Sequence, residues 1–237
     1  MRHSLAIAVA LLAVAGFAAA ENVADPELTA NVPSLVNLHE VIAPLWHDAF
    51  PQRDVAMVKE LLPALKDGVV KVQAATLPGI LRDKSERWQA GVAALVAATT
   101  ECERALAAAD TEATLAAVED VHARFEGLVR TVRPRLKELE AYHVVLYTLV
   151  HRHAPARSLA GLRDSSPALV VACDTLTKAP LPPRLADRGE AVKAGIAELC
   201  TATARFATTT GGEDVDAALA QLDIVHTLYQ ALERSLE

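Results

Sequence analysis

A repeat of three histidines at one offset constrains the fold of this chain more than any other feature. His39, His47 and His122 return 104 residues later, at positions 143, 151 and 226. The chain has only 8 histidines among 237 residues, so three coincidences in one gapless register are not accidental. Self-similarity at a fixed period predicts a duplicated structural unit.

The pattern within each copy is helical. Apolar residues recur at helical spacing, and the composition is rich in alanine and leucine and poor in aromatic residues. In the first copy, Ser34 is the predicted N-cap of a helix to about Phe50, followed by helices over 53–65, 81–108 and 111–132. Gly91 and Gly195 share one register in the third helix, which indicates close approach by a neighbour. We therefore predict an all-α protein, a tandem duplication of a four-helix, antiparallel bundle-like unit.

The predicted organisation has five parts. Residues 1–20 have the charged start, apolar run and Ala18-Ala19-Ala20 end of a secretory signal peptide. Residues 21–32 are predicted to be a flexible leader, 33–132 the first unit, 133–136 a junction and 137–237 the second unit. Because the junction contains Pro134 but little else that breaks a helix, we expect the last helix of the first unit to continue, kinked, into the second.

The signal peptide predicts a periplasmic or secreted protein, and no later segment is apolar for long enough to insert into a membrane. The net charge of −7 argues against nucleic acid as a partner. In an oxidising compartment, Cys173 and Cys200 of the second unit are the predicted disulfide pair. The equal alternative is that the cysteines are small core residues, and the role of Cys102 stays open.

The repeated histidines carry the main functional hypothesis. His39 and His47 are too far apart on one helix to share an ion comfortably, but His122 on an antiparallel fourth helix can reach either region. Glu119 lies three residues before His122, and Asp223 three before His226, so a carboxylate shares the helix face of each imidazole. We predict one metal site in each unit. The predicted ligands are His39, His47, His122 and Glu119 in the first unit, and His143, His151, His226 and Asp223 in the second.

Such nitrogen and oxygen donors suit a divalent transition metal, with zinc or copper first and nickel or iron next. We expect His39 and His122 to be the closest histidine pair of the first unit, as His143 and His226 are of the second. His47 and His151 are expected farther out, near the turn. The predicted role is metal binding or sensing, with a periplasmic protein as a further partner.

Two alternatives remain open. In the first, the protein is a metal-free helical scaffold or interaction protein whose histidines hold the helices in register. In the second, a minor one, the bundle binds haem without a covalent Cys-x-x-Cys-His attachment. The sequence contains no nucleophile elbow, His-Glu-x-x-His or phosphate loop, so we do not expect an enzyme. Asp83 and Asp187, which recur at the start of the third helix, are interpreted as solvated charges.

Overall fold

The computed structural model describes residues 25–133 and 136–236, and every regular element within them is helical. The predicted all-α class is therefore confirmed. The predicted signal peptide, residues 1–20, lies outside the described residues. None of the described helices is both long and apolar enough to cross a membrane.

The N-terminal helices follow one another antiparallel. The first, α1 (Pro33–Pro44), continues through a π-helical turn, η2 (Leu45–Ala49), into the short α2 (Phe50–Gln52). After it come α3 (Val55–Gln73), the 3₁₀ helix η3 (Gly79–Lys84), α4 (Ser85–Ala107) and α5 (Thr111–Val132). A further 3₁₀ turn, η1 (Pro26–Leu28), precedes them. We refer to α1 through α5 as the N-terminal unit.

The C-terminal unit contains α6 (Lys137–Thr148), the π-helical turn η4 (Leu149–His153), α7 (Leu159–Leu176), the 3₁₀ helix η5 (Pro183–Arg188), α8 (Gly189–Thr210) and α9 (Val215–Ser235). Each of these six elements begins 104 residues after an element of the N-terminal unit. The offset extends to the turns, because Arg53 and Arg157 both have positive φ, at 55° and 48°.

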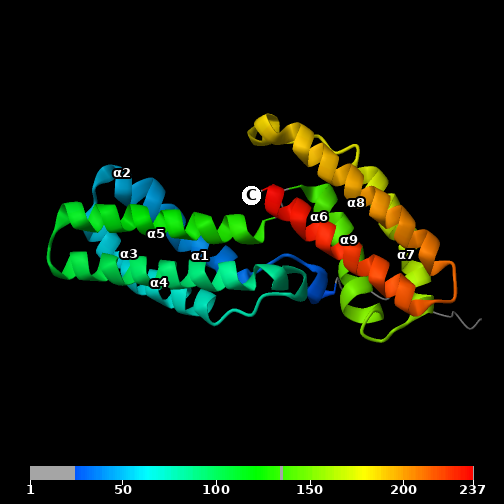
Figure 1. Cartoon of the computed structure of the whole chain (residues 1–237). Coiled ribbons are helices and arrows are strands. Elements are labelled where there is room, and N and C mark those ends of the chain that lie inside the picture. Colours follow the sequence, from blue (N-terminus) through cyan, green and yellow to red (C-terminus); the bar gives the residue numbers. More distant parts are fainter. Residues whose placement is uncertain (1–24, 134–135, 237) are drawn as a thin grey trace, which may run out of the picture.

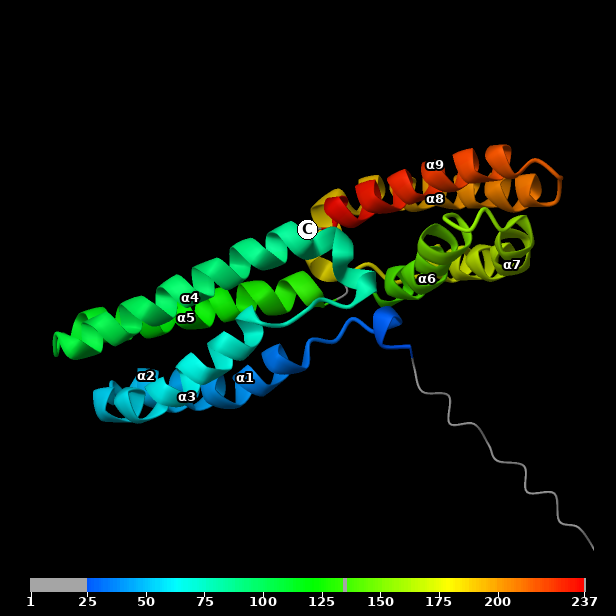
Figure 2. The ribbon, with the colours of Figure 1, turned by 90° about the horizontal axis from the view of Figure 1, so that it is seen from below.

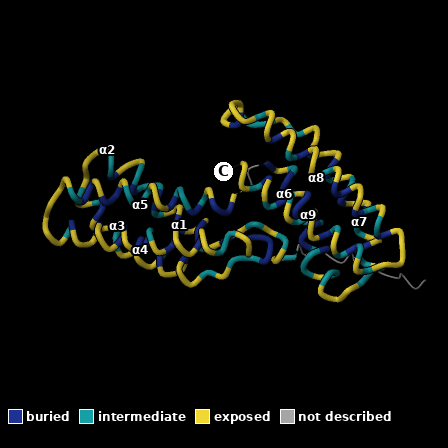
Figure 3. Tube along the Cα trace, in the orientation of Figure 1, coloured by how far each residue is buried: buried dark blue, intermediate teal, exposed yellow. Residues whose placement is uncertain are grey.

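Each unit buries a hydrophobic core, and Tyr147 of α6 packs into the core of the N-terminal unit. The two units lie end to end in an elongated molecule, and α9 returns the C-terminus to the middle (Figures 1 and 2). Buried residues line the inner faces of the helices, and exposed residues line the outer faces (Figure 3). Buried core positions keep the 104-residue offset, as in the pairs Leu38 and Tyr142, Leu95 and Leu199, Val118 and Leu222, and Phe125 and Tyr229.

Two predictions about the first helices are wrong. The N-cap of α1 is Val32, proline occupies the first helical turn, and the buried hydroxyl of Ser34 has no hydrogen-bond partner among the described residues. The next helix, α3, does not end near Leu65 but continues to Gln73 with Pro63 inside it. Its buried face extends through Val72, so tertiary packing offsets the hydrogen bond that the proline removes.

The predicted close approach at the two glycines is confirmed. A Cβ atom on Gly91 of α4 would lie 2.8 Å from Cδ2 of Leu128 on α5. A Cβ atom on Gly195 of α8 would lie 3.3 Å from Cδ1 of Leu232 on α9. Glycine therefore lets the last two helices of each unit pack closely.

The connection between the units is not the kinked continuous helix that we predicted. The helix α5 ends at Val132, and Arg133 is extended, as is usual for a residue before proline. Part of the segment that was predicted to be a flexible leader, residues 25–32, contacts the rest of the protein. Val32 is buried, and Glu27 accepts a hydrogen bond from the hydroxyl of Tyr147 in the other unit.

Cys173 of α7 and Cys200 of α8 form a disulfide, as predicted. Cys102 is free and buried in α4, where burial raises the pKa of its thiol to about 11. It therefore behaves as a small core residue and not as a reactive thiol.

Candidate functional site

The repeated histidines lie where the first helix of each unit meets the last. We call the contact of α1 and η2 with α5 the N-terminal seam, and the contact of α6 and η4 with α9 the C-terminal seam. The ring centre of His39 lies 5.8 Å from that of Phe125, and that of His143 lies 4.4 Å from that of Tyr229. The same contact between a histidine and an aromatic ring therefore crosses both seams.

The second histidine of each set lies in a π-helical turn. His47 belongs to η2 and His151 to η4. Pro44 precedes the first turn but Thr148 precedes the second, so proline does not explain both. Turns of π helix are rare in proteins, and those that do occur often lie at functional sites. An α-helical period alone does not predict where they occur.

One histidine of the C-terminal seam is buried. His143 is only 6 % exposed and lies between Tyr229, on which it stacks, and the edge of Tyr147. Burial lowers the pKa of His143 to about 3, although the negative charge of Asp83 acts in the opposite direction. His143 is therefore neutral at physiological pH.

A residue of the N-terminal unit closes one side of this seam. Arg82 of η3 donates a 2.7 Å hydrogen bond to the hydroxyl of Tyr147, and its Nη1 lies 3.2 Å from Nδ1 of His151. Because arginine can only donate, Nδ1 of His151 is the acceptor and the ring proton lies on Nε2. Burial, and then the charge of Arg82, lower the pKa of His151.

The two residues after Arg82 continue the contact along α9. Oδ2 of Asp83 accepts a 3.1 Å hydrogen bond from Gln230 and lies 3.5 Å from Nε2 of His226. The interaction with His226 lowers the pKa of Asp83 to about 2, against the opposing effect of burial. Lys84 forms a 2.9 Å ion pair with Glu233. Three consecutive residues of η3 thus bind the C-terminal seam.

The interpretation of Asp83 as a solvated charge is therefore wrong. Its counterpart Asp187 in η5 is exposed, and it forms no hydrogen bond or ion pair within the described part of the chain. The sequence offered one weak signal, since Arg82 is replaced by Ala186 while the aspartate is kept.

The corresponding positions of the N-terminal seam are open. His39 and His47 are exposed and His122 is half-buried, and none of the three imidazoles has a hydrogen-bond or ion-pair partner among the residues described. Trp46 stacks on His122, with 4.1 Å between ring centres and 4° between planes, and also on Phe50. Burial lowers the pKa of His122, and the charge of Glu126 opposes this effect.

The predicted carboxylates do not join these imidazoles. Glu119 and Asp223 are both exposed. The residue that faces each imidazole follows it by four positions: Glu126 acts on the pKa of His122, and the side-chain nitrogen of Gln230 lies 3.4 Å from Nε2 of His226. Positions three before and four after a residue lie on the same helix face, so spacing alone does not distinguish them.

The contacts between histidines also differ from the predicted order. His226 lies next to His151, with 6.1 Å between ring centres. After burial and Glu126, the charge of His47 affects the pKa of His122 more than that of His39 does. The ring contact thus favours His151 as the partner of His226, because the π turn η4 advances the helix face by one residue beyond the α-helical period.

The two seams differ in whether their histidine nitrogens already have protein partners. In the described ranges, no group of three or more His, Cys, Asp or Glu side chains is arranged to hold a metal ion. In the C-terminal seam, Arg82 and Asp83 already engage His151 and His226. In the N-terminal seam the imidazole nitrogens have no such partners, so a ligand could use them after side-chain rotation.

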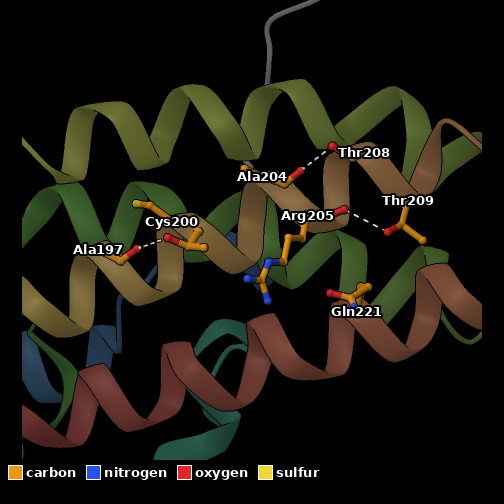
Figure 4. Close-up of a pocket in the computed structure, with 8 residues that line it drawn as sticks. Ala197, Cys200, Ala204, Arg205, Thr208, Thr209 and Gln221 are labelled. Atoms are coloured by element: carbon orange, nitrogen blue, oxygen red, sulfur yellow. Dashed lines mark hydrogen bonds between the residues drawn. The ribbon is translucent and has the colours of Figure 1, made fainter.

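A separate hollow lies on the outer side of α8, beside α9 (Figure 4). Its threonine hydroxyls already donate to the carbonyl groups of their own helix: Thr201 to Ala197, and Thr208 to Ala204. Apart from Arg205 and Gln221, small side chains and satisfied hydroxyls line this hollow, so few groups converge there to orient a ligand.

No model of a known protein family, no curated protein and no solved structure matches the chain. The function therefore has to be inferred from the two seams themselves.

Proposed function

We propose that this is a periplasmic or secreted protein made by tandem duplication of one four-helix unit, and that it binds a divalent transition metal ion without catalysing a reaction. The duplication is supported by six elements that begin at one offset and by the two separate cores. The proposed periplasmic or secreted location rests on the signal-peptide pattern of residues 1–20.

The observation that supports metal binding most is the contrast between the two seams. His143, His151 and His226 are held by protein groups, whereas His39, His47 and His122 have uncommitted nitrogen atoms. We therefore assign the site to the N-terminal seam, and the histidines of the C-terminal seam to a structural role.

The donor set limits which ion can bind there. Imidazole nitrogens suit zinc and copper, and also nickel and iron, and Glu126 adds a carboxylate on the same seam. An ion would bind His122 through a nitrogen at the edge of the ring, at about 2.0–2.2 Å, so Trp46 can stay stacked on its face. The exposure of His39 and His47 gives the ion a route from solvent.

Thermal unfolding of the untagged mature chain tests this proposal. Zinc or copper added after treatment with a chelator should raise the melting temperature, because a ligand that binds only the folded state stabilises it by mass action. Unchanged melting with every one of the four ions, together with no uptake in equilibrium dialysis, would refute metal binding.

The second candidate is a metal-free scaffold or interaction protein with structural histidines. It is favoured by the ring contacts of His39 with Phe125 and of His143 with Tyr229, which need no metal. It predicts that replacing His122 lowers stability equally with chelator and with metal, because the stacking on Trp46 is lost in both conditions. Metal binding predicts a loss that depends on the ion.

A further inference from the structure

A cavity of about 370 Å³ lies between the start of α1 and the end of α5. Its lining includes His39 and Phe125 of the N-terminal seam, together with Val36, Glu126 and Val129, while residues 30–32 and Arg133 line its other end. Val36 is 60 % exposed, so its aliphatic side chain is accessible to a docked segment. Two of these residues, His39 and Glu126, are also donors of the metal site proposed above.

The same place in the C-terminal unit is filled. The positions 104 residues after His39, Glu126, Val129 and Val36 are His143, Gln230, Glu233 and Glu140. Gln230 donates to Asp83, and Glu233 pairs with Lys84. The charge of Lys84 also acts on the pKa of Glu140, which burial raises. Asp83 and Lys84 of η3 therefore occupy the groove of the C-terminal unit. The cavity described above is the equivalent groove of the N-terminal unit.

The substitutions between the two grooves indicate what the empty one can accept. Asp83 contacts His226 and Gln230. Their counterparts in the N-terminal groove are His122 and the acidic Glu126, so a basic side chain fits at the place that corresponds to Asp83.

The carboxylates around Lys84 have aliphatic counterparts. Glu233 and Glu140 correspond to Val129 and Val36, so an aliphatic side chain fits where Lys84 lies.

We propose that the groove between α1 and α5 docks a short segment of a partner protein in which a basic residue is followed by an aliphatic one. A second copy of this chain does not fit, because η5 would offer Asp187 to Glu126 and Arg188 to the two valines. The net charge of −7 adds to the attraction for a basic segment.

A peptide taken from the chain itself tests the proposal. The probe is a synthetic peptide of residues 79–92 carrying Asp83→Lys and Lys84→Leu, and the control is the unaltered peptide. Both are titrated into the isotope-labelled mature chain, and NMR shifts of α1 and α5 are followed. The altered peptide should shift these residues and bind roughly tenfold more tightly than the control, given one attractive and one repulsive charge contact.

A groove variant provides the reciprocal measurement. Val36→Glu and Glu126→Gln give the N-terminal groove two residues of the C-terminal groove, and these positions tolerate polar side chains because Val36 is exposed and Glu126 is half-buried. The variant should prefer the unaltered peptide. Equal binding of both peptides, no shift in α1 or α5, or self-association of the chain through this groove would overturn the proposal. The peptide titrations are done without metal, so their outcomes are independent of the proposed metal binding.

Discussion

Nε2 of His226 lies 3.5 Å from Oδ2 of Asp83, so a histidine of the C-terminal unit is paired with a carboxylate of the N-terminal unit. The counterpart of His226, His122, instead stacks on Trp46 and has no polar partner among the described residues. Equivalent imidazoles therefore have different surroundings because η3 docks on only one of the two seams.

Asp83→Asn should weaken the contact between the units. The pKa of Asp83 is lowered to about 2 from 3.8, mainly by His226. Since the side chain is 27 % exposed, solvent screening reduces the expected loss in the free energy of unfolding to about 1 kcal/mol. Urea unfolding measures it. Asp187→Asn is the matched control and should change nothing, because Asp187 is exposed; an equal loss in both variants would contradict the docking of η3.

His143 should make the C-terminal unit sensitive to acid. Burial lowers its pKa to about 3 from 6.5, so the unfolded chain binds a proton that the folded chain does not. Its contribution is complete above about pH 6.5 and is lost as the pH falls toward 3, by roughly 4 kcal/mol.

His143→Phe should reduce this pH dependence, since phenylalanine keeps a ring against Tyr229 and cannot titrate. Unfolding by urea between pH 7 and pH 4 measures the effect. His39→Phe, at the exposed equivalent position, should leave the pH dependence as in the unaltered chain. A slope that survives in His143→Phe would show that other groups cause it.

Reduction of the disulfide should destabilise the C-terminal unit selectively. Cys173 and Cys200 are 27 residues apart, and closing a loop of that length stabilises a fold by about 3 kcal/mol. Hydrogen exchange with and without a reductant should show faster exchange in α7 and α8 and little change in α3 and α4. Uniform acceleration in both units would mean that they unfold as one cooperative body.

Much of this fold follows from the sequence because the repeat and the helical period can be read directly from the order of the residues. The start of α5 at Thr111 and the glycine contacts at Gly91 and Gly195 follow from such patterns. The continuation of α3 past Pro63 does not, because packing of Val69 and Val72 outweighs a local proline penalty.

The candidate site was harder to predict for a different reason. The role of Asp83 depends on how one unit docks on the other, which no spacing within a unit encodes. The choice of Glu126 over Glu119 depends on the direction in which α5 faces the seam, and the π turn around His47 changes the phase of α1. These are tertiary effects on top of a correct helical pattern.

Trp46 should report metal binding. It stacks on His122, so an ion that binds this imidazole places positive charge beside the indole. Zinc, which does not itself quench by redox chemistry, should therefore change the emission of Trp46, while the buried Trp88 stays constant. Trp46→Phe should abolish the change. A zinc-dependent change that persists in Trp46→Phe would place the ion elsewhere.

The most direct test of the central claim is calorimetric titration of zinc and of copper into the chelator-treated mature chain, compared with His122→Ala and His226→Ala. These variants change the same position in the two units. We predict one ion per chain, with binding weakened at least about tenfold by His122→Ala, or 1.4 kcal/mol, and unchanged by His226→Ala, which should only lower stability. Binding of two ions per chain, equal loss in both variants, or no heat of binding in the unaltered chain would contradict the assignment of the metal site to the N-terminal seam.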